Sequence, residues 1–162
     1  MTVKTTSSNP NADVRAKALI LAIGNDSRND DGLGWAAADK LAHFHPAVQV
    51  EMCYQLQVED AELIQSYPLV IFIDASKDKY IRGFQWEQTP YVDNIYTMNT
   101  HALKPTEVLA LCDQVYGQRP LAYTLAISGY KWNLKTGLTN KAKRNLDDAI
   151  TFLMQWINQA VK

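Results

Sequence analysis

The stretch "ALILAIGNDSRNDDGLGWAAADKL", residues 18–41, combines a strand, a turn and a helix. Residues 18–24 are continuously apolar, which is typical of a strand covered on both faces of a sheet. Leu33, Ala37 and Leu41 then recur at helical spacing. The turn between them holds two adjacent carboxylates, Asp30 and Asp31. This order predicts a β-strand that leads directly into an α-helix.

Apolar runs of strand length continue to alternate with amphipathic segments along the chain. Further strands are predicted at 48–54, 69–75 and 121–128, edge-like strands at 84–89 and 94–98, and helices at 58–67, from Pro105 and from about Thr139. This alternation predicts an α/β three-layer sandwich, in which a twisted, mostly parallel sheet of about five strands is flanked by helices.

The composition is that of one globular domain. Of the 162 residues, 47% are hydrophobic and 20% are charged, with 16 basic against 17 acidic side chains and no basic cluster. We therefore expect neither nucleic acid nor a membrane as partner. Residues 1–16 are polar and lack the apolar core of a signal peptide, so we expect a flexible N-terminal tail, a single domain over 17–162 and a cytoplasmic location.

Three carboxylates follow predicted strands. Asp30 and Asp31 come after the first strand, and Asp74 ends the strand at 69–75. Parallel sheets bind ligands in the crevice at the carboxyl ends of their strands, so these side chains are expected to share one crevice. Adjacent carboxylates repel each other, which favours a bound cation or proton chemistry.

A transition metal at this crevice requires a further ligand, because imidazole suits nickel, zinc or copper better than carboxylate alone. His101 lies in the turn before the helix that Pro105 opens, so it can be placed at the same edge. The predicted cluster is therefore Asp31, Asp74 and His101. The other two histidines, His43 and His45, are expected on the solvated surface at the end of the first helix.

Several other kinds of site do not match the spacing. The turn lacks both the Gly-Lys-Ser/Thr ending of a phosphate loop and the three spaced glycines of a dinucleotide loop. In an EF-hand alignment, Ala38 stands where a bidentate glutamate is required. Cys53 and Cys112 match no CxxC spacing, so we expect two buried reduced thiols. Ser128 lacks a nucleophile elbow and is expected to be a strand-end serine, so no covalent nucleophile is nominated.

A structural role also has to be weighed for the adjacent pair. Asp30 or Asp31 is expected to cap the helix that begins near Gly32, but capping explains one carboxylate and leaves the other. We assign the crevice to Asp31 and expect Asp30 to cap or brace the turn. Asn25 and Gly32 complete the set of supporting residues.

Four segments resemble the hydrogenase maturation endopeptidases. They are "IGNDSRNDDGLG", the strand "VIFIDA" with Asp74, "THAL" around His101, and "GLT" before the last helix. They occur in the family's order and approximate spacing between residues 18 and 160. The GN-x4-DDG-x-G loop, the strand-end aspartate and the histidine turn are together specific for the family.

The resemblance implies an endopeptidase that acts late in assembly of nickel–iron hydrogenases. Such enzymes recognise nickel in the large-subunit precursor and remove a short C-terminal extension. The family's metal-contacting and catalytic positions correspond to Asp31, Asp74 and His101, and the nickel is expected to be carried by the precursor.

Two details depart from the family pattern. Asp31 stands where glutamate is frequent, and "CYQLQVEDAEL" replaces a glycine-rich turn, in a form that resembles the branch serving bidirectional NAD-linked hydrogenases. Two other functions stay open at this point. One is a noncatalytic nickel-binding assembly factor for hydrogenase, and the other is a metal-dependent hydrolase of small molecules.

Overall fold

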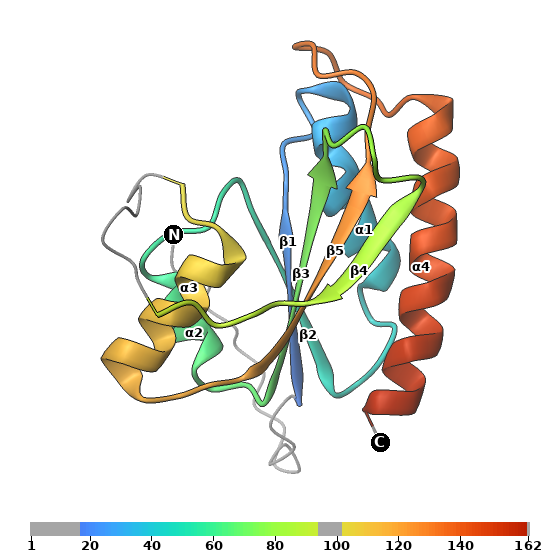
Figure 1. Cartoon of the computed structure of the whole chain (residues 1–162). Helices are drawn as coiled ribbons and strands as arrows, with labels where there is room; N and C mark the ends of the chain where they lie inside the picture. The colour runs from blue at the N-terminus through green and yellow to red at the C-terminus, as the bar shows by residue number, and fades with distance from the viewer. Residues whose placement is uncertain (1–16, 94–101, 162) are drawn as a thin grey trace, which may run out of the picture.

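A computed structural model describes residues 17–93 and 102–161, and within them the strands form a five-stranded sheet (Figure 1). The strands are β1 (Ala18–Ile23), β2 (Val48–Cys53), β3 (Leu69–Ser76), β4 (Phe84–Gln88) and β5 (Leu121–Ser128). Their order is β2-β1-β3-β5-β4, and only the pairing of β4 with β5 is antiparallel. The predicted mostly parallel sheet is confirmed, with β2 and the antiparallel β4 as its edge strands.

Helices cover both faces of the sheet (Figure 1). The helices α1 (Leu33–Leu41) and α4 (Asn140–Ala160) lie on one face, and α2 (Asp60–Ile64) and α3 (Pro105–Leu111) lie on the other. A 3-10 helix, η1 (Asn29–Gly32), leads into α1, and a π-helical segment, η2 (Cys112–Tyr116), continues α3. This is the predicted three-layer α/β arrangement.

Alternate residues of the central strands divide the core in two. Ile71 and Ile73 of β3 pack toward α1 and α4, whereas Val70 and Phe72 pack toward α2 and α3. All four side chains have no exposed surface. The continuous apolar sequence of β3 is therefore explained by burial on both faces.

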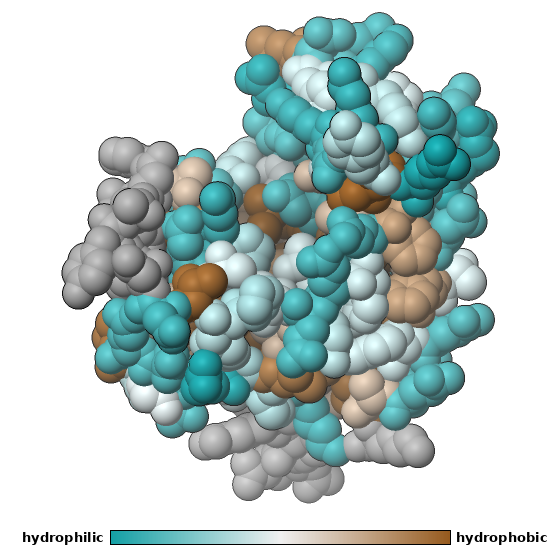
Figure 2. Space-filling model, in the orientation of Figure 1, coloured by the Kyte–Doolittle hydropathy of each residue, from teal (hydrophilic) through white to brown (hydrophobic). Residues whose placement is uncertain are grey.

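Aromatic side chains anchor the edge strand to α4. The ring of Trp86 stacks on Tyr123 of β5 at 4.8 Å between centroids, and it meets Trp156 of α4 edge-on at 4.9 Å. Such pairs add to the stability that burial of the rings provides. On the face shown in Figure 2, the more apolar side chains occur in small groups among hydrophilic ones.

Two glycines allow the chain to fold back tightly after β1. A Cβ atom on Gly34 would lie 2.0 Å from the carbonyl oxygen of Ile23, and one on Gly24 would lie 2.6 Å from the carbonyl oxygen of Asp31. No side chain fits at either distance. The glycine pattern of the opening motif therefore serves close backbone packing, which holds η1 at the carboxyl end of β1.

Some predicted boundaries differ from the structure. The helix predicted at 58–67 is limited to Asp60–Ile64. Leu56, which precedes the predicted helix, forms an isolated bridge with Leu103. The expected strand at 94–98 and the expected tail at 1–16 lie outside the described residues. None of the helices in the described part of the chain is long and apolar enough to cross a membrane.

Candidate active site

Asp31 and Asp74 meet at the carboxyl edge of the sheet. Asp31 belongs to η1, and Asp74 belongs to β3, two residues before its end. Both are half-buried. Asp74 follows the alternation of Val70 and Phe72, so its side chain lies on the face that α2 and α3 cover. The structure thus brings two of the three predicted ligands together.

The pKa of Asp74 is raised from its ordinary value of 3.8 to about 7. Burial is the largest cause, and the negative charge of Asp31 raises the pKa further. The N–H of Ala75 donates a hydrogen bond to Oδ1 of Asp74 at 2.8 Å, which opposes both effects. Asp74 can therefore exchange a proton near neutral pH or release it to a cation.

His101, the third predicted ligand, lies outside the described residues. The described part of the chain resumes at Ala102. Next to it, the N–H of Leu103 donates to the carbonyl oxygen of Leu56 at 3.1 Å. Across residues 17–93 and 102–161, no three His, Cys, Asp or Glu side chains are grouped so that they hold a metal ion. The assignment of His101 stays a prediction from the sequence.

Asp30 braces the turn, which is one of the two roles predicted for it. Its side chain is fully buried, and its carboxylate accepts hydrogen bonds from the N–H groups of Tyr130, Lys131 and Thr139 and from Oγ1 of Thr139, at 2.7 to 3.1 Å. Residue Gly32 precedes α1 without any side-chain cap. The expectation that Asp30 or Asp31 caps α1 is therefore wrong. Asp30 instead ties η1 to the N-terminus of α4, which Thr139 caps.

The supporting residues Asn25 and Gly32 shape the turn. The N–H of Asn25 donates to the carbonyl oxygen of Asp31 at 2.9 Å, and Oδ1 of Asn25 accepts from the N–H of Ser27 at 3.0 Å. A Cβ atom on Gly32 would lie 3.0 Å from Cα of Asp26. These contacts fix the backbone of η1 and thereby the place of Asp31.

A cysteine lies beside the carboxylates, and sequence reasoning did not place it there. Cys53 ends β2 and is half-buried. Its pKa is raised to about 12 by burial and then by the charges of Asp60 and Asp74, so the thiol stays neutral. Its position at the carboxyl end of a parallel strand was the signal in the sequence. Both cysteines are free, as predicted, but only Cys112 is fully buried; Cys53 was expected to be buried and is half-exposed at the sheet edge.

The other candidates lie away from this edge or have structural partners. Ser128 ends β5 and is buried, and its hydroxyl donates to the carbonyl oxygen of Ile81 at 2.8 Å, so it is the strand-end serine that was predicted. His43 is exposed after α1, whereas His45 is half-buried and its Nδ1 accepts from the N–H of Ala47 at 3.1 Å.

No protein-family model matches the sequence, and no curated protein matches it either. Solved structures do match. The hydrogenase maturating endopeptidase HybD from Escherichia coli is 16% identical, with a TM-score of 0.68 over 90% of this chain and 94% of that one. The [NiFe] hydrogenase maturation protease HycI from Thermococcus kodakarensis is 20% identical, with a TM-score of 0.68 over 87% and 92% of the two chains.

The chain has the fold of these hydrogenase maturation proteases. A further structure, an Escherichia coli endopeptidase solved in solution, is 15% identical, with a TM-score of 0.70 over 90% of this chain and 94% of the other. At such identities the likeness concerns the fold. It confirms the α/β fold that the alternation of strands and helices predicted, and the turn with Asp31 and the strand with Asp74 are parts of this fold.

Proposed function

We propose that this protein is an endopeptidase that removes the C-terminal extension of a nickel-loaded [NiFe]-hydrogenase large-subunit precursor. The observation that carries the proposal is the pair Asp31 and Asp74, two interacting half-buried carboxylates at the sheet edge. In the described part of the chain, neither forms an ion pair with a basic side chain. The shared fold and the sequence motifs support the same function.

Nickel in this proposal is part of the substrate. Two carboxylates and the imidazole of His101 supply oxygen and nitrogen ligands and leave coordination positions for the precursor's own groups. Because Asp74 holds a proton up to about pH 7, engagement of the nickel displaces that proton. Recognition therefore strengthens as the pH rises through neutrality.

The chemistry is hydrolysis of one peptide bond. Water adds to the carbonyl carbon, the carbon–nitrogen bond breaks, and the departing amine takes up a proton. Cys53 is not the nucleophile in this proposal, because its thiol is neutral at physiological pH.

The decisive experiment incubates the protein with a purified nickel-loaded precursor and measures the precursor's mass. The wild type is expected to shorten it by the C-terminal extension and to leave the nickel-free precursor intact. Binding without shortening would make the protein a noncatalytic nickel-binding assembly factor. Equal cleavage of the nickel-free precursor would refute recognition of nickel.

The His101→Ala variant tests the third ligand in the same assay. We expect cleavage to be lost while the circular dichroism spectrum and thermal midpoint stay close to those of the wild type. A folded His101→Ala protein that cleaves at the full rate would remove His101 from the site.

A further inference from the structure

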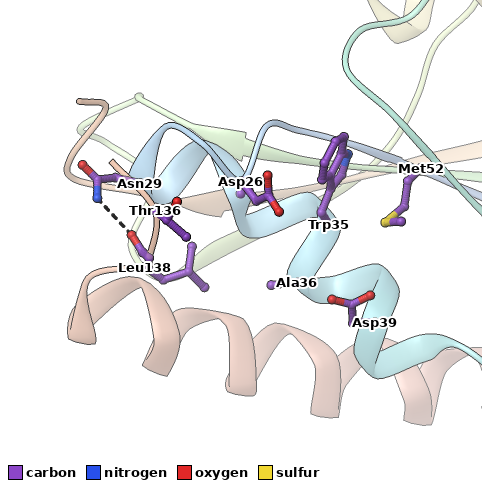
Figure 3. Close-up of a pocket in the computed structure, with 10 residues that line it drawn as sticks. Asp26, Asn29, Trp35, Ala36, Asp39, Met52, Thr136 and Leu138 are labelled. Atoms are coloured by element: carbon purple, nitrogen blue, oxygen red, sulfur yellow. Dashed lines mark hydrogen bonds between the residues drawn. The ribbon is translucent and has the colours of Figure 1, made fainter. Parts of the chain in front are cut away.

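A hollow lies next to the turn that carries Asp31. It is a cavity of about 400 Å³ between η1, the start of α1, β2 and the segment before α4. Figure 3 shows Trp35, Asp39 and Met52 toward one end and Asn29, Thr136 and Leu138 toward the other. The cavity is large enough for a few side chains of a bound peptide.

The cavity opens on the opposite face of the sheet from the candidate active site. Met52 and Cys53 are neighbours in β2, so their side chains point to opposite faces. Cys53 packs with the α2 and α3 side and lies near Asp74, whereas Met52 lines the cavity. One turn, η1, therefore borders two separate sites.

The far wall of the cavity is held in place before any ligand binds. Nδ2 of Asn29 donates to the carbonyl oxygen of Gly137 at 3.0 Å (Figure 3). The N–H of Asn29 donates to the carbonyl oxygen of Lys135 at 2.7 Å. The four hydrogen bonds to Asp30 hold the same loop. A preformed site spares a ligand the cost of ordering the loop.

The lining combines apolar surface with negative charge. Its apolar members are Trp35, Ala36, Met52 and Leu138. Met52 is 52% exposed, so its side chain is accessible to a ligand in the cavity. Asp26 and Asp39 also line the cavity, and both are exposed. No lysine or arginine is among the described lining residues. Neither aspartate forms an ion pair in the described ranges.

We propose that this cavity is an exosite for a peptide segment of the precursor in which apolar side chains alternate with lysine or arginine. Apolar side chains and the aliphatic stems of basic ones would cover Met52 and Trp35, and the basic head groups would reach Asp26 and Asp39. The inference rests on the proposed function for the identity of the partner. It adds a contact distant from the bond that is cut.

The binding test does not require cleavage. Two probes are used, acetyl-Leu-Arg-Leu-Lys-amide and its acidic counterpart acetyl-Leu-Glu-Leu-Asp-amide. The readout is the indole N–H signal of Trp35 in a nitrogen-15 NMR spectrum, assigned with a Trp35→Phe variant. We expect a saturable shift with the basic peptide and none with the acidic one.

Variants that reverse the charge of an aspartate inside or outside the cavity test the role of the negative charge. Asp39→Lys is expected to weaken binding of the basic peptide at least tenfold, and Asp26→Lys is expected to weaken it as well. Asp148→Lys, on an exposed position of α4 outside the cavity, is expected to leave binding unchanged. Equal binding of both peptides, or no effect of Asp39→Lys, would overturn the exosite.

Cleavage of the nickel-loaded precursor then tests the partner. Asp39→Lys is expected to raise KM about tenfold with little change in kcat, and Asp148→Lys is expected to change neither. An unchanged KM in Asp39→Lys would overturn the assignment to the precursor.

Other outcomes separate the exosite from the proposed function. If the wild type bound the basic peptide but did not cut the precursor, the proposed function would fail, whereas the peptide site would still be supported. Self-association that Asp39→Lys abolishes would instead make a second copy of the chain the occupant and overturn the proposal.

Discussion

Two neighbouring aspartates in η1 lie in opposite environments. Asp30 is fully buried and accepts four hydrogen bonds from the loop before α4. Asp31 is half-buried, faces the sheet edge and repels the carboxylate of Asp74. Asp30 stabilises the structure, because hydrogen bonds from the protein satisfy its carboxylate oxygens. Asp31 and Asp74 repel each other, so this pair favours the binding of a proton or a cation.

Replacement of Asp30 is expected to have the largest effect and to show that its role is structural. Asp30→Ala leaves the part-buried N–H groups of Tyr130, Lys131 and Thr139 without their acceptor, so the free energy of unfolding should fall by roughly 3 to 5 kcal/mol. Urea denaturation followed by circular dichroism measures this. The control is Asp148→Ala, an exposed site where about 0.5 kcal/mol or less is expected. If the free energy of unfolding fell by less than about 1 kcal/mol in Asp30→Ala, the structural role that distinguishes Asp30 from Asp31 would be contradicted.

Replacement of Asp31 should separate chemistry from stability. Asp31→Asn removes a carboxylate from the site but leaves no buried donor unpaired. We therefore expect cleavage of the nickel-loaded precursor to fall at least about 100-fold, equivalent to roughly 3 kcal/mol of transition-state stabilisation. The unfolding free energy should stay within about 1 kcal/mol of the wild type. Asp31→Glu keeps the charge and should retain substantial activity; loss of activity in Asp31→Glu but not in Asp31→Asn would contradict this role.

The pH dependence of stability tests Asp74, the carboxylate that interacts with Asp31. Folded Asp74 keeps its proton up to about pH 7, but in the unfolded chain it loses the proton near its ordinary pKa of 3.8. Between these values the folded state binds more protons, so the contribution of Asp74 to stability decreases as the pH rises. Asp74→Asn should remove this slope and raise the unfolding free energy at pH 7 by up to about 4 kcal/mol. An Asp74→Asn protein that keeps the slope would assign it to other groups.

The smallest expected effect concerns Cys53. Burial and the charges of Asp60 and Asp74 raise the pKa of its thiol to about 12, so alkylation by iodoacetamide at pH 8 should be slow in the folded protein. Asp74→Asn removes one of the lesser causes and should quicken the reaction by only a few-fold. Mass spectrometry of the labelled peptide measures both rates. Rapid labelling of Cys53 in the wild type would show an ionised thiol at this edge.

Local sequence determined most of the secondary structure. The apolar runs at β1, β3 and β5 and the helical spacing of Leu33, Ala37 and Leu41 predicted the elements, because burial of a strand or helix leaves a periodic pattern in its own residues. The order of strands and helices then predicted which carboxylates reach the same edge of a parallel sheet. The proximity of Asp31 and Asp74 could be inferred for this reason.

The tertiary structure alone decided what each polar side chain contacts. Asp30 was expected to cap the helix or brace the turn, but the sequence did not show that its donors are 100 to 109 residues away. The proximity of Cys53 to Asp74 depends on β2 and β3 lying on either side of β1, and the cavity depends on the same loop that Asp30 holds. A hydrogen bond or a cavity between distant segments leaves no periodic signal in either segment, so only their packing against each other reveals it.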